Sequence, residues 1–124
     1  MGFLHKPLEM VNRRDQGLKA ESRVQKFLET SGFKFYCRNF RWKGGEVDLV
    51  MEDPNGTLVF VEVRSSTKES PWLRYSIQRA KRRRMMATTH EFFLRNPKMR
   101  IKPFRFDLVW VEQIKIEHWK NITL

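Results

Sequence analysis

The sequence contains very little cysteine: Cys37 is the only one among its 124 residues. A single cysteine excludes a disulfide within the chain and a cysteine-rich zinc site. Long hydrophobic runs are also missing, since none exceeds four residues, whereas a helix needs about 20 to cross a bilayer. The N-terminus, which is interrupted by charged residues and proline, gives no secretory signal. We therefore expect a cytoplasmic protein without a membrane segment.

Acidic residues are scarce relative to basic ones. Fourteen Asp and Glu stand against 25 Lys and Arg, which gives a net charge of +11 and a pI near 10.3. Such a charge creates a field that attracts polyanions. Nucleic acid is therefore the first expected partner, and its rivals are an anionic membrane surface and RNA of the ribosomal type.

The chain has the size and composition of one globular domain. Its 40% hydrophobic and 31% charged residues distinguish it from disordered chains, which cannot bury enough apolar surface to fold. We expect a basic N-terminal arm at residues 1–14, ending in Arg13 and Arg14, and one domain at residues 15–124.

Hydrophobic periodicity predicts two helices and two hairpins. One helix is expected from Asp15, an N-cap candidate, to a stop at Gly32, and another at residues 77–95. An aromatic strand with alternating polarity is expected at residues 33–40. Hairpins are expected at residues 44–64 and 104–119.

The first hairpin fixes the direction of its acidic side chains. Its three turn residues, Pro-Asn-Gly at 54–56, suit a type I turn followed by a left-handed glycine. The numbers of paired residues then sum to 110. With this register Asp48 lies opposite Glu62, and Glu46 lies opposite Arg64.

Two carboxylates that face each other repel, by up to about 1 kcal/mol when exposed and by more when buried. A sequence that places Asp48 opposite Glu62 usually supplies a cation, and a divalent metal ion is one such cation. The alternative is an ion-pair ladder of little energetic consequence, in which Arg64 bridges Glu46 and Glu62. The acids lie between apolar residues at the open end of the hairpin, which favours the metal site.

The second predicted helix carries a basic run that no acid interrupts. It is long enough to touch phosphates on one side of a duplex. The alternative is a solvated helix face, but the high net charge favours phosphate binding. The candidate nucleic-acid-binding residues are this run and two cations that precede the glycines of the first hairpin: Arg79, Lys81, Arg82, Arg83, Arg84, Arg41 and Lys43.

Several motifs follow one another in an informative order. They are Gly17 and Glu21, RNFRWKGGEVDLV at residues 38–50, LVFVEVR at 58–64, the basic helix, and RFDLVWV at 105–111. This order resembles the YraN-like family, which is similar to archaeal Holliday junction resolvases of the PD-(D/E)XK nuclease superfamily. The resemblance covers nearly the whole chain after residue 14. It implies an α/β fold with a restriction-endonuclease-like core, in which helices flank a central mixed β-sheet.

The resemblance also implies the residues of a nuclease site. Asp48 and Glu62 are the expected metal ligands, Glu21 is an outer ligand, and Glu46 matches the family's glutamate before the aspartate. Our lead hypothesis adds a backbone carbonyl, that of Val63, to the ligands of a Mg²⁺ or Mn²⁺ ion. The implied catalytic set is Glu21, Glu46, Asp48, Glu62 and Arg64.

The sequence departs from the family pattern at Arg64, where the family has lysine. Arginine stays protonated, so Arg64 can stabilise negative charge but cannot readily accept a proton. A water molecule activated by the metal could act without a lysine, and Lys43 or Lys81 could replace it. The lead hypothesis is hydrolysis of phosphodiester bonds in DNA. The resolvases suggest branched DNA as the substrate and a homodimer as the assembly.

Two other functions stay open. One is a noncatalytic nucleic-acid-binding module that keeps the nuclease scaffold, because Arg64 replaces the lysine. The other is a protein-interaction domain whose basic face meets an acidic partner, which predicts no salt-sensitive affinity for DNA. Outside the site, Asp107 is expected to be structural, and the histidines, His118 among them, are too dispersed to suggest a catalytic triad.

Overall fold

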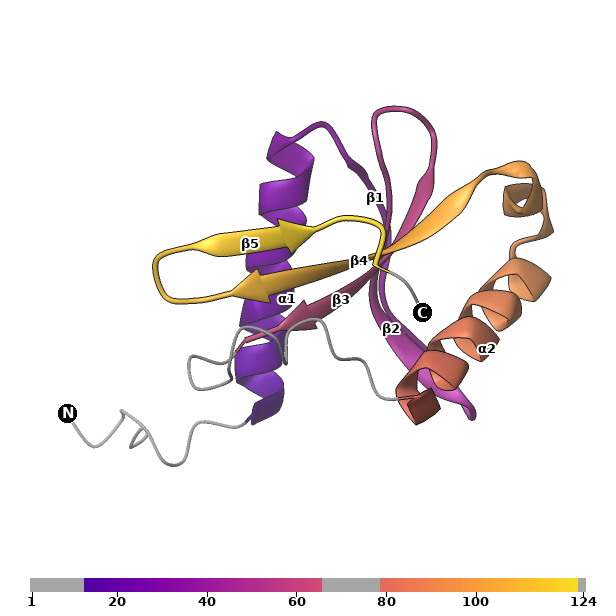
Figure 1. Cartoon of the computed structure of the whole chain (residues 1–124), viewed down its shortest axis with the longest axis horizontal. Helices are drawn as coiled ribbons and strands as arrows, with labels where there is room; N and C mark the ends of the chain where they lie inside the picture. The colour runs from indigo at the N-terminus through magenta and orange to yellow at the C-terminus, as the bar shows by residue number, and fades with distance from the viewer. Residues whose placement is uncertain (1–12, 66–78, 123–124) are drawn as a thin grey trace, which may run out of the picture.

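A computed structural model describes residues 13–65 and 79–122, with side chains from residues 19–65 and 81–122. The described chain forms two α-helices, a short 3-10 helix and a five-stranded sheet (Figure 1). Its elements are α1 (Arg13–Thr30), β1 (Lys34–Trp42), β2 (Gly45–Glu52), β3 (Leu58–Arg64), α2 (Arg79–Arg95), η4 (Pro97–Ile101), β4 (Phe104–Val111) and β5 (Ile116–Trp119). Neither helix is long and apolar enough, over the described residues, to span a membrane.

The first helix starts earlier than predicted and ends where predicted. Because α1 begins at Arg13, Asp15 lies inside the helix and the predicted N-cap is wrong. Arginine is a good helix former, so the helix continues back into the last residues of the predicted arm. The rest of that arm, residues 1–12, lies outside the described chain.

Gly32 ends α1 as a left-handed C-terminal residue, with φ of 90°. The N–H of Phe33 donates to the carbonyl of Leu28 at 3.0 Å, and the N–H of Gly32 donates to that of Glu29 at 3.0 Å. These two bonds form a Schellman motif. Phe33 is thereby placed in the core beside Leu28.

The sheet is mixed, as expected for a restriction-endonuclease-like core. Its strands lie in the order β1-β2-β3-β4-β5, and β3 and β4 are the one parallel pair in the described sheet. A parallel pair needs a crossover connection, and α2 lies in it. The predicted α/β fold with helices flanking a mixed sheet is confirmed.

The predicted register of the first hairpin is confirmed where the strands pair, between residues 49–52 and 58–61, while the predicted backbone pairs of Asp48 with Glu62 and of Glu46 with Arg64 lie beyond the end of this ladder. Leu49 pairs with Val61 and Val50 with Phe60, so the paired numbers sum to 110. At the turn, the N–H of Asp53 donates to the carbonyl of Thr57 at 2.9 Å. The turn closes through Gly56, whose φ of 86° lies in the left-handed region that glycine enters without strain.

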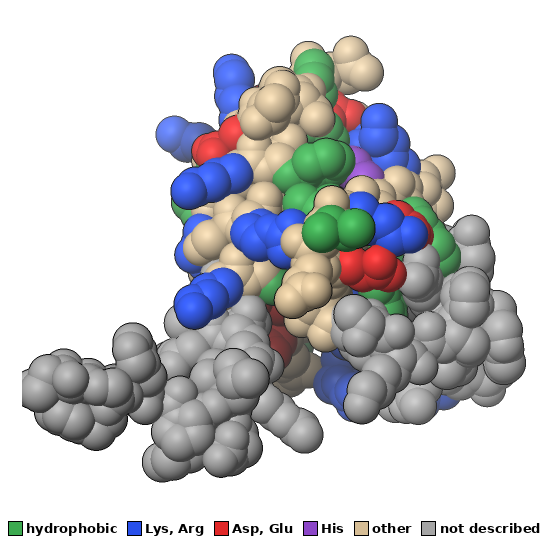
Figure 2. Space-filling view, turned by 90° about the vertical axis from the view of Figure 1, so that its left-hand side faces the viewer, with side chains coloured by type: hydrophobic (Ala, Val, Ile, Leu, Met, Phe, Trp, Pro, Cys, Tyr) green, Lys and Arg blue, Asp and Glu red, His purple; other side chains and the backbone are tan. Residues whose placement is uncertain are grey.

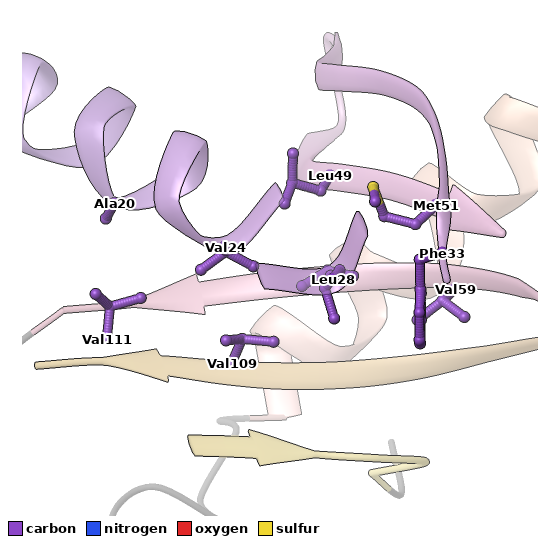
Figure 3. Packing of buried hydrophobic residues seen from close by; sticks show 10 residues of the cluster. Ala20, Val24, Leu28, Phe33, Leu49, Met51, Val59, Val109 and Val111 are labelled. Atoms are coloured by element: carbon purple, nitrogen blue, oxygen red, sulfur yellow. The ribbon is translucent and has the colours of Figure 1, made fainter. Parts of the chain in front are cut away.

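Each face of the sheet is buried by one helix, and the two helices lie on opposite sides of it in Figure 1. On one face, Ala20, Val24 and Leu28 of α1 pack on residues of β2, β3 and β4 (Figure 3). On the other, Met85 and Phe92 of α2 pack on a second cluster that includes Val50, Phe60 and Phe106. Since β2 and β3 are buried on both faces, a charged side chain on either strand needs a partner.

The neighbouring strand β4 also carries a charge, Asp107, which is fully buried. Arg105 donates to its Oδ1 at 3.0 Å, the N–H of Asn121 donates to the same oxygen at 2.8 Å, and His118 Nε2 lies 2.7 Å from Oδ2. Arg105 also reaches Asp53 of the hairpin turn at 2.7 Å. Asp107 is thus structural, as predicted, and His118 is one of its partners.

We predict that Asp107→Ala lowers the free energy of unfolding by about 3 kcal/mol, because it leaves Arg105 buried beside an empty space. Urea unfolding followed by circular dichroism measures the change. Glu91→Gln is the control, because the Glu91–Arg95 pair bridges one turn of α2 near the surface and contributes at most about 0.5 kcal/mol. Equal losses in the two variants would contradict the structural role of Asp107.

Candidate metal and nucleic-acid site

The ladder between β2 and β3 ends in a side-chain contact. Its last backbone pair is Leu49 with Val61. Beyond it, the N–H of Val63 donates to Oδ2 of Asp48 at 2.8 Å. A carboxylate thus takes the place that a backbone carbonyl holds in a continuing ladder. The alternation of β2 is interrupted here too, since Val47 packs on the α2 side while Leu49 packs under α1.

The beginning of β2 is held against α2 by a glycine. A Cβ on Gly45 would lie 2.6 Å from Oγ1 of Thr88, so a larger residue would push β2 and α2 apart. The same buried hydroxyl accepts a 2.8 Å hydrogen bond from Trp42 Nε1. These contacts fix the end of β1, the beginning of β2 and the first half of α2 relative to one another.

A cleft of about 530 Å³ opens between these elements. Three acids and four cations line it: Glu46, Asp48, Glu62, Arg41, Lys43, Lys81 and Arg84. The structure therefore brings the opposed pair, Asp48 and Glu62, to one space and surrounds it with basic side chains.

Asp48 and Glu62 differ in their partners. Glu62 is buried and forms ion pairs with Lys81 of α2 and, at 3.6 Å, with Nε of Arg64. Asp48 has the N–H of Val63 as a donor. Burial raises the pKa of Asp48 to about 8, and the negative charge of Glu62 adds to the rise. In the absence of a metal ion the Asp48 carboxyl group is therefore protonated near neutral pH.

The observed ion pairs differ from the predicted alternative, in which Arg64 bridges Glu46 and Glu62. Glu46 is an exposed residue that pairs with Arg41 at 2.9 Å, and Arg64 pairs with Glu62. Arg64 thus contacts Glu62 but does not bridge it to Glu46, whose ion-pair partner is Arg41. The Arg41–Glu46 pair lies at the rim of the cleft, where solvent weakens it.

Glu21 of α1 lies near this group but is not among the residues that line the cleft. It is 8% exposed, and its Oε1 has no hydrogen-bond partner among the described residues. Burial raises its pKa, while Asn39 and Arg38 act in the opposite direction. A buried carboxyl oxygen without a partner is costly, so this one has unused capacity to accept a hydrogen bond.

The oxygen ligands present fit a divalent cation of the Mg²⁺ or Mn²⁺ type. The N–H and C=O of one strand residue point to the same neighbouring strand, so the carbonyl of Val63 is directed toward β2 and Asp48. No three His, Cys, Asp or Glu side chains within the described residues come close enough to hold a metal ion by themselves. A metal would therefore depend on Asp48, Glu62, the carbonyl and water, with Glu21 outside direct contact.

The predicted nucleic-acid-binding residues divide into three groups. Lys81 and Arg84 line the cleft from α2, as Arg41 and Lys43 do from the other side. Arg83 is exposed, and Arg82 is half-buried with no hydrogen-bond partner for its Nε among the described residues. The side chain of Arg79 lies outside the described part of the chain.

The left-hand side of the molecule in Figure 1 differs from the cleft in how its charged side chains are arranged. Figure 2 shows that its Lys and Arg side chains are spread apart, with acidic and hydrophobic side chains between them. The cleft, in contrast, collects basic side chains around Asp48 and the buried Glu62. The local arrangement there, rather than the net charge alone, suggests where a phosphate would bind.

Sequence reasoning missed two features of the site. The contact of Lys81 with Glu62 joins α2 to β3, and no spacing of residues in the sequence predicts it. The hydrogen bond of Trp42 to Thr88 is likewise a contact between distant residues. The Gly44-Gly45 pair was the available signal for it, since adjacent glycines mark places where backbone approaches another element.

A family model described as uncharacterised protein family UPF0102 matches residues 20–111. The chain belongs to this family. A UPF0102 protein of Cupriavidus taiwanensis is 39% identical over 113 residues, which are 90% of this chain and 85% of that protein. UPF0102 proteins of Burkholderia pseudomallei and Xylella fastidiosa are each 40% identical, over 86% and 81% of this chain and 73% and 83% of their own lengths.

The match confirms the family that the sequence motifs resembled. The UPF0102 segment contains every acid and cation that lines the cleft, as well as Glu21 and the buried Asp107. The site and the structural network around Asp107 therefore both lie within the part of the chain that matches the family.

We predict that the stability of the protein falls as pH rises, in a manner that depends on Asp48. Its pKa is 3.8 in a model compound and about 8 in the fold, so between these values the folded chain binds a proton that the unfolded chain lacks. Stability is then lost with increasing pH. Asp48→Asn cannot titrate, but its amide oxygen can still accept the hydrogen bond from Val63.

Urea unfolding across this pH range tests the prediction. The wild type should lose roughly 1 kcal/mol per pH unit relative to Asp48→Asn. Parallel curves for the two proteins would show that the Asp48 carboxyl titrates normally.

Proposed function

We propose that the protein is a Mg²⁺- or Mn²⁺-dependent endonuclease that hydrolyses phosphodiester bonds in DNA, with branched DNA as its substrate, in the cytoplasm. The observation that carries the proposal is the pair formed by Asp48 and Glu62 in a cleft lined by four cations. The carboxylates of buried Glu62 and half-buried Asp48 repel and favour a divalent ion, while the surrounding basic side chains favour the phosphates that such an ion would polarise.

The acidic residues in and beside the cleft have distinct parts in this proposal. Asp48 and Glu62 would hold the ion together with the carbonyl of Val63, and Glu21 would accept a hydrogen bond from a water molecule near the ion. The ion, when bound, polarises the phosphate and lowers the pKa of water. Glu46 holds Arg41 at the rim of the cleft, 2.9 Å away, where the guanidinium can meet a DNA phosphate.

Arg64 acts in the proposal as a fixed positive charge. Arginine is a poor proton acceptor, so Arg64 would stabilise negative charge that develops on the phosphate and would not act as the base. Its Nε lies 3.6 Å from Oε1 of Glu62, which supports a role for this charge near the proposed ion.

A second function is favoured by the same residue. Arg64 stands where the resembling nucleases have lysine, and a chain that lost the proton acceptor could keep the fold and bind nucleic acid without cutting it. Metal-dependent cleavage separates this noncatalytic module from the endonuclease. Both functions require that the basic cleft binds phosphate.

We predict that the wild-type protein cleaves branched DNA in the presence of Mn²⁺ and that Asp48→Asn and Glu62→Gln cut at least about 100-fold more slowly. Branched and linear DNA are incubated with each protein across a Mn²⁺ titration, and the products are separated on a gel. Glu29→Gln is the control, because Glu29 is an exposed acid of α1.

Equal cutting by the wild type and Asp48→Asn would exclude this site as the source of activity. Salt-sensitive DNA binding without cleavage at any Mn²⁺ concentration would support the noncatalytic module instead. A homodimer, which the resolvase resemblance suggests, predicts paired cuts in the two strands of a junction.

DNA affinity should depend on salt through the cleft cations. We predict that Lys43→Gln or Arg84→Gln weakens binding several-fold for every DNA sequence and lowers the slope of log K against log salt by about 1. Fluorescence anisotropy measures both quantities in Asp48→Asn, which blocks cleavage. Lys26→Gln on the exposed face of α1 should leave the slope nearly unchanged. Affinity without any salt dependence would favour an acidic protein partner over DNA.

A further inference from the structure

Lys81 occupies an unexpected position for a residue of a basic helix. Its ammonium group donates a hydrogen bond to Oε1 of Glu62. The Glu62 side chain is only 10% exposed and that of Lys81 is 32% exposed, so the pair is partly shielded from solvent. Arg64, the other cation on Glu62, lies 3.6 Å from the same oxygen, beyond hydrogen-bond distance.

The ammonium group stands where the proposed metal would bind. Glu62 supplies one of two carboxylates in the cleft, and a divalent ion on Oε1 would have to replace the hydrogen bond from Lys81. Two cations cannot share one carboxylate oxygen at close range without strong repulsion. Lysine can leave readily, because its charge is carried on a flexible four-carbon chain.

The same side chain can reach a phosphate. Lys81 and Arg84 are three residues apart on α2 and therefore lie on one side of the helix, where both line the cleft. A released Lys81 ammonium would remain in the cleft next to Arg84. Two adjacent cations there suit one phosphate group.

We propose that Lys81 is an internal cation that competes with the divalent metal for Glu62, and that metal binding transfers its ammonium group to a phosphate of the nucleic acid. The inference rests on the proposed metal-dependent function of the same cleft. It adds a contribution of Lys81 to the coupling between metal and nucleic acid: the released ammonium group should increase the mutual tightening that contact between the ion and the phosphate produces by itself.

The first test is the binding of Mn²⁺ alone, measured by calorimetry on the full chain without DNA. Lys81→Met should bind Mn²⁺ at least about tenfold more tightly than the wild type, because the competitor is gone. Lys81→Arg keeps the charge and should stay near the wild type. Arg84→Met removes a cation from the same cleft and helix, and should change the affinity less than about threefold.

The direction of the change in Mn²⁺ affinity distinguishes competition for Glu62 from loss of a structural contact. A Lys81 that only supports the fold would make Lys81→Met bind Mn²⁺ more weakly. Weaker or unchanged binding in Lys81→Met would overturn the proposal, as would equal tightening in Arg84→Met. Absence of Mn²⁺ binding in all of the proteins would overturn it as well.

The second test is DNA affinity with and without Ca²⁺, used as a probe ion that takes the same oxygen ligands. Ca²⁺ should tighten DNA binding by the wild type several-fold more than it tightens DNA binding by Lys81→Met. An equal effect of Ca²⁺ on both proteins would contradict the transfer of Lys81 to phosphate. Both tests measure binding, so a protein that shows the coupling but never cuts DNA would overturn the nuclease and support the role of Lys81.

Discussion

The hydrogen bond from the N–H of Val63 to the Asp48 carboxylate is the contact on which the site depends. It replaces a backbone bond at the point where β2 and β3 cease to pair. A carboxylate in that position is withdrawn from water and brought beside Glu62, and these two effects raise its pKa to about 8. Where the ladder between β2 and β3 ends, two acidic side chains thus lie close together, and this arrangement favours the binding of a cation.

The rest of the fold positions the elements that carry these acidic side chains. Because α1 and α2 cover opposite faces of the sheet, the acids have little access to solvent except through the cleft. Gly45 lets β2 lie against Thr88 of α2, which carries Lys81 and Arg84 to the same space. Toward the hairpin turn, Arg105 joins Asp53 to Asp107, so a separate set of ion pairs stabilises the other end of the strands.

Local sequence signals predicted the parts of the molecule that local physics determines. The left-handed glycines at 32 and 56 fixed a helix end and a hairpin register, and that register placed Asp48 opposite Glu62. Contacts between distant elements were not predictable in this way. Neither the pairing of Lys81 with Glu62 nor that of His118 with Asp107 follows from spacing, because each depends on how α2 or β5 packs. The predicted N-cap at Asp15 was wrong because α1 already begins at Arg13, and arginine is a good helix former.

The most direct measurement is anomalous diffraction from crystals of the protein soaked in Mn²⁺. We expect an anomalous peak between the carboxylates of Asp48 and Glu62, within bonding distance of both, with the ammonium group of Lys81 displaced from Glu62. A cleft that takes up no Mn²⁺ while Lys81 stays on Glu62 would exclude a metal site formed by these two acids.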